Sequence, residues 1–239
     1  MPRYRIFALV LGVVLSASAQ ARYPIVTWSI TPTSEPANLG QLKAKLKAYH
    51  DCTLTPKNVS SCYASSLDRQ IRRAIPYLEG SVKEKSPASR LALVLDIDET
   101  SLSNYEEISE ADFAYNSKQW NDWVEEAKAP AIPGTLRLYQ RARQLGVAIF
   151  FITGRPELQR EATEKNLHTA GYADWSGLIM PTPEQAKDST ILYKSAAREK
   201  IANQGYRIVL NVGDQWSDLK GKPQAELSVK LPDPFYYIP

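Results

Sequence analysis

Short apolar runs alternate with helical segments along most of the chain, and this alternation limits the folds that it can adopt. Runs that are apolar at every position are typical of strands buried on both faces of a sheet. The candidate strands lie at residues 91–95, 147–152, 176–180, 207–212 and 227–231, the last as an edge strand. Segments with helical periodicity separate them, at residues 134–145, 156–170 and 190–204. This order predicts an α/β fold with a parallel sheet flanked by helices.

One connection is far longer than a crossover needs. About 35 residues separate the first strand from the helix near residue 134, whereas loops in α/β units usually have about 2–6 residues. We expect a cap inserted over the carboxyl end of the sheet at residues 101–133. Its aromatic side chains form either the core of the cap or a platform for substrate. Tyr105, Trp120 and Trp123 are the candidates for such a platform, since aromatic faces suit nucleobases and aryl groups.

The residues before the first strand predict a leader and a helical extension. Arg3 and Arg5 precede an apolar run, and Ala19-Gln20-Ala21 follows, which is typical of a cleaved signal peptide at residues 1–21. An uncleaved anchor is the alternative, but the run is shorter than the roughly 20 residues that span a bilayer. Residues 22–239 then form a single domain, in which residues 22–88 are an N-terminal extension with helices at 39–49 and 61–83. We expect a periplasmic or secreted protein with no stable membrane anchor after cleavage.

Charge and rare residues exclude several classes of function. The mature chain would hold 27 basic and 26 acidic residues, a net charge near +1 that indicates no nucleic-acid partner. The two histidines, His50 and His168, are too few for a histidine-rich metal site or a histidine-based triad. Cys52 and Cys62 either form a disulfide, as exported proteins often do, or remain two buried thiols. Nothing in the sequence sets the oligomeric state.

Polar residues follow the candidate strands where ligands bind in open α/β sheets. Asp96 and Asp98 follow the first strand and project to the same side of an extended backbone. Two carboxylates so close repel each other unless a cation or a shared proton intervenes. The other strand ends and a helix start supply Thr153, Gly154, Arg155, Lys194, Asp214 and Asp218. This set suits a hard divalent cation, a phosphate group and a free carboxylate for nucleophilic attack.

At these residues the sequence resembles a known family. The segments "LVLDIDETSLSN", "FFITGRP", "LYKSAAREKI" and "NVGDQWSDL" match in order the four motifs of the haloacid dehalogenase-like phosphatases. The match is to the secreted acid phosphatase branch, which includes bacterial acid phosphatases and plant vegetative storage proteins, and the tail "KLPDPFYYIP" is similar to the end of that branch. The resemblance implies a Rossmann-like parallel sheet with a helical cap after the first motif.

The resemblance also implies a role for each residue. Asp96 would attack phosphorus, and Asp98 would protonate the leaving alcohol and then activate water. Thr153, Gly154 and Lys194 would bind the phosphoryl group. Mg²⁺ would be held by Asp96, Asp214 and the backbone carbonyl of Asp98, with Asp218 as a supporting or water-mediated partner. The substrate would be a small phosphate monoester, including a nucleotide or aryl phosphate, and a protonated Asp98 would give an optimum near about pH 5–6.

Two other functions and two residues stay open at this point. A storage or binding protein on the same fold is disfavoured because Asp96 is intact, whereas some plant relatives have lost the nucleophile. A phosphotransferase would share the aspartyl-phosphate and would pass the phosphoryl group to an alcohol. Arg155 either contacts substrate phosphate or an acid of the cap, or it caps the following helix region or pairs on the surface. Glu99 either braces the loop after the nucleophile or is exposed.

Overall fold

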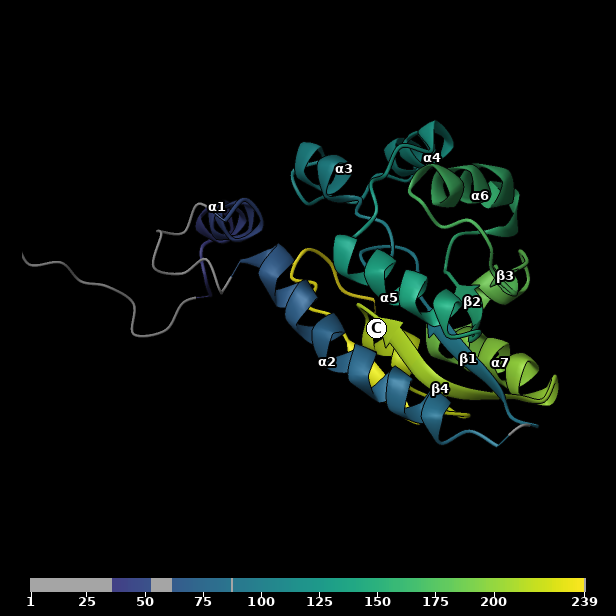
Figure 1. Cartoon of the computed structure of the whole chain (residues 1–239). Coiled ribbons are helices and arrows are strands. Elements are labelled where there is room, and N and C mark those ends of the chain that lie inside the picture. The colour runs from purple at the N-terminus through teal and green to yellow at the C-terminus, as the bar shows by residue number, and fades with distance from the viewer. Residues whose placement is uncertain (1–35, 53–61, 87, 239) are drawn as a thin grey trace, which may run out of the picture. The chain divides into compact units, whose positions relative to one another are not determined.

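The computed structural model describes residues 36–52, 62–86 and 88–238, and it contains the predicted parallel sheet (Figure 1). The strands are β1 (Arg90–Leu95), β2 (Ala148–Ile152), β3 (Gly177–Ile179), β4 (Tyr206–Gly213) and β5 (Leu227–Lys230). Their order is β3-β2-β1-β4-β5, and every pair is parallel. β1 is therefore central, and β5 is an edge strand as predicted.

Alternate side chains of β1 enter two different cores. Leu91, Leu93 and Leu95 pack with α2 (Tyr63–Lys83) and α5 (Pro133–Gln144). The shorter side chains of Ala92 and Val94 pack on the other face with Tyr193, Ala197 and Ile201 of α7 (Thr190–Asn203). Because both faces are covered, the buried positions of β1, Leu91 to Leu95, must all be apolar, whereas Arg90 at its start is exposed. This burial explains the apolar runs of the sequence.

The predicted N-terminal extension contains α1 (Leu39–His50) and α2, joined by a disulfide between Cys52 and Cys62. The structure thus decides between the disulfide and two free thiols. The predicted helix at 156–170 begins as a 3₁₀ turn at Glu157–Gln159 and continues as α6 (Arg160–Thr169). No helix within the described ranges has the length and apolar character to cross a membrane. The predicted signal peptide lies outside the described residues.

The long insertion after β1 forms two helices of the cap, α3 (Tyr105–Glu110) and α4 (Ser117–Glu126), on the side of the carboxyl ends of the strands (Figure 1). Asn116 begins α4 by accepting hydrogen bonds from the amides of the next turn at 3.0 and 3.1 Å. Ala127 ends it in the left-handed conformation. Trp123 and Val124 are buried, so one face of α4 belongs to the main core. The short α8 (Trp216–Leu219) follows β4.

Candidate active site

The site lies at the carboxyl edge of the sheet, where three neighbouring strands end. Leu95 of β1 pairs with Phe151 of β2 and with Val212 of β4. Residues that follow these positions reach the same edge, and they include Asp96, Thr153 and Asp214. The register of the buried strands therefore brings together site residues that are far apart in the sequence.

A tight turn after β1 fixes the backbone beside Asp96. Three successive amides, beginning at residue 100, donate to the carbonyl of Ile97, and the Ser101 hydroxyl donates to the carbonyl of Asp96 at 2.6 Å. Glu99 has a φ of +52°, which is uncommon for a residue with a side chain. Its buried carboxylate accepts hydrogen bonds from the backbone and side-chain amides of Asn104, at 2.6 and 2.9 Å. Glu99 thus braces this turn.

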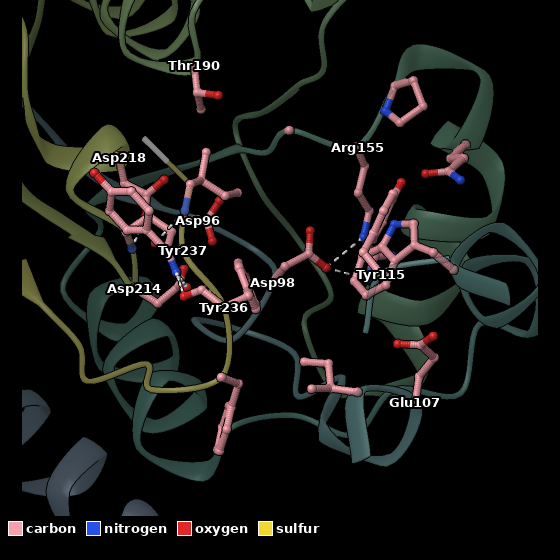
Figure 2. Close-up of a pocket in the computed structure, with 18 of the residues that line it drawn as sticks. Asp96, Asp98, Glu107, Tyr115, Arg155, Thr190, Asp214, Asp218, Tyr236 and Tyr237 are labelled. Carbon is pink, nitrogen blue, oxygen red and sulfur yellow. Dashed lines mark hydrogen bonds and ion pairs between the residues drawn. The ribbon is translucent and has the colours of Figure 1, made fainter. Parts of the chain in front are cut away.

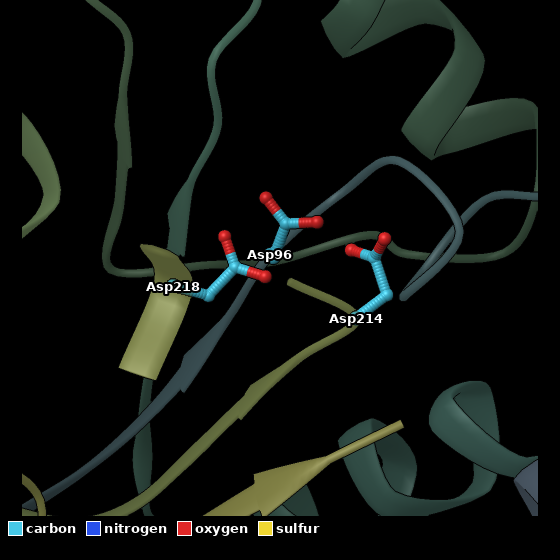
Figure 3. Close-up of side chains that lie close together, drawn as sticks. All are labelled: Asp96, Asp214 and Asp218. Atoms are coloured by element: carbon cyan, nitrogen blue, oxygen red, sulfur yellow. The ribbon is translucent and has the colours of Figure 1, made fainter. Parts of the chain in front are cut away.

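The ammonium of Lys194 lies between two carboxylates on the floor of the site. Its Nζ is 2.5 Å from Oδ1 of Asp96 and 2.5 Å from Oδ1 of Asp218. All three side chains are buried, and Lys194 comes from the second turn of α7. Asp214 adds a third carboxylate, and one oxygen each of Asp96, Asp214 and Asp218 lie within 4.8 Å of one another (Figure 3).

Burial of this cluster changes its proton affinities. Burial raises the pKa of Asp96 to about 7, with Lys194 opposing the shift and Asp218 adding to it. Burial also raises the pKa of Asp214 well above its usual range, and Asp218 and Asp96 reinforce the effect. Burial lowers the pKa of Lys194, but the attraction of Asp218 and Asp96 outweighs it and leaves that pKa above its usual value. A buried cluster with more carboxylates than cations holds protons tightly.

The donor set of this cluster fits a divalent metal ion. Three carboxylates face one ammonium, and no cationic side chain among the described residues pairs with Asp214. Asp214 instead accepts hydrogen bonds from the Thr100 hydroxyl at 3.2 Å and the Gln215 amide at 2.7 Å. Clustered carboxylate oxygens are the ligands that hard divalent cations prefer, and such an ion would balance the excess negative charge.

Asp98 faces Arg155, beside this cluster. The guanidinium of Arg155 donates to Oδ1 of Asp98 from Nε at 2.9 Å and from Nη2 at 2.7 Å (Figure 2). Arg155 is buried, and its backbone amide donates to the Thr153 hydroxyl at 3.1 Å. Of the two roles left open for Arg155, the structure shows contact with an acid, but the acid is Asp98 and not a residue of the cap. Gly154, between them, lines the cavity described next.

A cavity of about 570 Å³ opens above these groups (Figure 2). Asp96, Asp98, Lys194, Asp214 and Asp218 lie on its wall. The cap contributes Phe113, Tyr115, Trp120 and Asn121, and the C-terminal residues contribute Phe235, Tyr236, Tyr237 and Ile238. The cavity is thus polar at the strand ends and largely aromatic at the cap and the tail.

The three aromatic residues proposed as a platform lie in different places. Trp120 lines the cavity. Trp123 is buried, and its Nε1 donates to Oδ1 of Asn104 at 2.9 Å. Tyr105 stacks on the ring of His50, with centroids 3.2 Å apart. Among the described residues, the cavity lining contains neither Trp123 nor Tyr105, because Trp123 packs in the main core and Tyr105 packs against α1.

The C-terminal tail is a part of the site to which the sequence assigned no role. The side chain of Gln215 donates to Asp214 and to Asp233, both at 2.7 Å, and accepts from the amide of Ile238 at 3.2 Å. One glutamine therefore connects a carboxylate of the candidate metal site with the tail. The signal was present in the aromatic run "FYYI", but only the folded chain shows that these four residues line the cavity.

Comparisons with known proteins agree with this architecture. The fold is similar to the class C acid phosphatase from Bacillus anthracis, with a TM-score of 0.66 over 82% of this chain and 87% of that chain. The identity is 22%, so this likeness concerns the fold alone. Acid phosphatase 1 of Solanum lycopersicum is 40% identical over 148 residues, which cover 61% of this chain and 58% of the tomato protein.

Plant storage and stem proteins are also similar. The stem 28 kDa glycoprotein of Glycine max is 43% identical over 150 residues, which cover 61% of this chain and 59% of the soybean protein. Vegetative storage protein 1 of Arabidopsis thaliana is 31% identical over 215 residues, which cover 87% of this chain and 76% of that protein. The chain spans less than two thirds of the tomato and soybean proteins.

A family model matches residues 27–239, which include every element of the sheet, the cap and the site. Together with the parallel sheet and the four motifs, three at strand ends and one in α7, this match shows that the chain belongs to the HAD superfamily, subfamily IIIB (acid phosphatase).

Proposed function

We propose that this chain is an exported, Mg²⁺-dependent acid phosphatase that hydrolyses phosphate monoesters through an aspartyl-phosphate on Asp96. The observation that carries the proposal is the position of Lys194. Its ammonium bridges Asp96 and Asp218 at the floor of a cavity that also contains Asp98 and Asp214. A nucleophile, an acid, a cation and a cluster that fits a metal therefore surround one space.

In the first step, a carboxylate oxygen of Asp96 attacks phosphorus and the ester P–O bond breaks. The leaving oxygen takes a proton from Asp98, whose carboxyl lies in the same cavity. Lys194 and the backbone beside Thr153 stabilise negative charge on the phosphoryl oxygens. When bound, Mg²⁺ would offset the charge repulsion between a carboxylate and a phosphate anion, held by Asp96, Asp214 and the Asp98 carbonyl.

In the second step, Asp98 acts as a base. Its carboxylate removes a proton from water, the water oxygen attacks phosphorus, and the bond to Asp96 breaks to release phosphate. The enzyme thus returns to its starting state, with the proton back on Asp98. Because the first step needs a protonated Asp98, we expect an optimum near about pH 5–6. Activity that keeps rising through about pH 8 would contradict this assignment.

The cavity wall supports an aromatic leaving group, such as an aryl or nucleoside group. Trp120 and Tyr115 of the cap and Tyr237 of the tail lie on that wall, and aromatic faces stack on such groups. Export is supported by the leader-like sequence at residues 1–21. The disulfide between Cys52 and Cys62 also supports it, since disulfides persist in oxidising compartments.

A substrate panel tests the proposal. Nucleoside monophosphates, sugar phosphates and aryl phosphates are assayed with Mg²⁺ and with EDTA, for the wild type and for Asp96→Asn. We expect hydrolysis by the wild type with Mg²⁺ and loss of activity in EDTA and in the variant. Full activity in either of those two conditions would overturn the mechanism. Adding an acceptor alcohol separates phosphatase from phosphotransferase, because a transferase leaves the phosphoryl group on the alcohol.

A further inference from the structure

Asn104 is a buried side chain whose hydrogen-bonding capacity is fully used. It lies just before α3, at the root of the cap. Its Nδ2 donates to Oδ1 of Asp98 at 3.0 Å and to Oε2 of Glu99 at 2.9 Å. Its Oδ1 accepts from Nε1 of Trp123 at 2.9 Å and from Nη2 of Arg155 at 3.3 Å. An asparagine amide has two donor hydrogens and two acceptor sites, and all four are occupied here.

These partners fix the orientation of the amide. The NH₂ group faces two carboxylates, whereas the oxygen faces an indole N–H and a guanidinium, neither of which can accept a hydrogen bond. Rotating the amide by half a turn would place donors against donors. A hydrogen bond from Trp123 of the cap therefore orients Asn104, and a hydrogen bond from Asn104 orients Asp98.

The two oxygens of Asp98 differ as a result. Oδ1 receives three hydrogen bonds, from Asn104 at 3.0 Å and from Arg155 at 2.9 and 2.7 Å. Oδ2 accepts none from the described residues, and the dashed lines from Arg155 reach a single oxygen of Asp98 (Figure 2). A proton on Oδ1 would meet three donor hydrogens. The oxygen that can carry the reacting proton is thus Oδ2.

We propose that Asn104 is a positioning residue that links Trp123 of the cap to Asp98, so that Oδ2 presents its proton to the leaving group. This inference rests on the proposed phosphatase function. If Asn104 has this role, its loss must slow the cleavage of esters with poor leaving groups, which need a proton, more than the cleavage of esters with good leaving groups.

The experiment compares two substrates at one fixed pH. A nitrophenyl phosphate releases a stable anion that needs little help from an acid, whereas an alkyl phosphate releases an alkoxide that needs a proton. The quantity measured is kcat/KM, which includes the step that expels the leaving group. General acid help is worth about 10²- to 10⁴-fold. For Asn104→Ser and Asn104→Asp we expect the alkyl value to fall at least roughly tenfold more than the nitrophenyl value.

A second buried asparagine provides the matched control. Asn166 donates to the carbonyl of Ala129 at 2.7 Å and accepts from its amide at 3.2 Å, so it supports the far end of the cap without touching Asp98. Asn166→Ser should lower kcat/KM for both substrates by the same factor. Equal losses for the Asn104 variants, as for this control, would reduce Asn104 to a structural role and overturn the proposal.

A milder variant covers the case in which the Asn104 variants do not fold. Trp123→Phe keeps the buried ring and removes only the N–H that holds Asn104. It should shift the ratio of the two substrates in the same direction by about threefold, and an unchanged ratio would overturn the link to the cap. Failure of the proposed function is distinguishable, because then the wild type cleaves neither substrate or Asp96→Asn keeps its activity.

Discussion

Lys194 donates a 2.5 Å hydrogen bond to the carboxylate of Asp96, and both side chains are buried. The same ammonium reaches Asp218 at 2.5 Å, so one cation joins Asp96 to the helix that follows β4. This contact gives Lys194 two separate effects. Lys194 lowers the cost of burying Asp96, and it supplies positive charge where phosphate oxygens would lie.

Removing that ammonium should therefore harm activity more than an ordinary buried substitution. We predict that Lys194→Met, which keeps much of the volume, lowers kcat/KM for a phosphate monoester by about 10²-fold or more. Steady-state assays of the purified variant at saturating Mg²⁺ check this, with circular dichroism to verify folding. A folded variant with activity within a few fold of the wild type would contradict the role of Lys194.

The buried carboxylates predict how metal-free stability depends on pH. The pKa of Asp96 is raised to about 7, and burial raises those of Asp214 and Glu99 as well. An unfolded carboxyl titrates near about pH 4, so between about pH 4 and 7 the folded chain binds more protons than the unfolded chain. Stability from Asp96 is present at low pH and is lost as the pH rises through about 7, and the raised pKa values of Asp214 and Glu99 act in the same direction.

Thermal unfolding in EDTA and in Mg²⁺ tests that sign. In EDTA the unfolding temperature should fall from pH 5 to pH 8. This fall corresponds to a loss of about a few kcal/mol in the free energy of unfolding. Mg²⁺ should stabilise the protein most at the higher pH, since a bound cation replaces the protons. Identical unfolding temperatures with and without Mg²⁺ at every pH, or an unfolding temperature that rises with pH in EDTA, would contradict the metal site.

Gly213, at the end of β4, has no room for a side chain. A Cβ there would lie 2.3 Å from Cβ and 2.4 Å from Oδ2 of Asp218, which must then move. We predict that Gly213→Ala lowers activity by at least about tenfold and weakens Mg²⁺ binding, because Asp218 holds Lys194. Gly80→Ala in α2 is the control: nothing lies within 4 Å of its Cβ, and the change should stabilise the helix by roughly 0.5–1 kcal/mol. Equal behaviour of the two variants would refute the steric argument.

The disulfide adds a covalent link to α1, whose other contacts are partly buried, such as those of Tyr49 with Tyr63 and of Lys47 with Phe113. α1 has no buried residue, and it contacts the cap through the ion pair of Lys43 with Asp112 at 2.7 Å and the stacking of His50 on Tyr105. An exposed ion pair contributes at most about 1 kcal/mol. Reducing the bond between Cys52 and Cys62 should therefore speed amide hydrogen exchange in α1 while β1 stays protected. Unchanged exchange in α1 after reduction would show that its contacts suffice.

The sequence predicted the parts of this site that depend on strand order. Buried apolar runs fix the register of a parallel sheet, so the approach of Asp96 to Thr153 and Asp214 follows from their places after β1, β2 and β4. The contact of Arg155 with Asp98 does not follow in this way. Their separation is 57 residues, and the contact depends on the path of the turn after β2, which no periodicity encodes.

The contacts of the cap and the tail were harder to predict from the sequence, because they too depend on the path of irregular segments. The extra length of residues 101–133 indicated a cap, but aromatic composition does not show which rings face a cavity. Trp120 lines it, whereas Trp123 is buried because its indole N–H has a partner in Asn104. Gln215 lies beside a motif aspartate, yet its contact with Asp233 crosses 18 residues of chain.

We propose that Asp96 carries the phosphoryl group during turnover, and trapping that group on the protein is a direct test. The protein is mixed with a nitrophenyl phosphate and Mg²⁺, quenched in acid and digested, and its peptides are weighed by mass spectrometry. The Asp98→Asn variant should accumulate the intermediate, because it lacks the base that activates water. We predict one phosphoryl group on the peptide that contains Asp96, and none in Asp96→Asn. A phosphoryl group on a different residue, or turnover by Asp96→Asn without any adduct, would contradict the account.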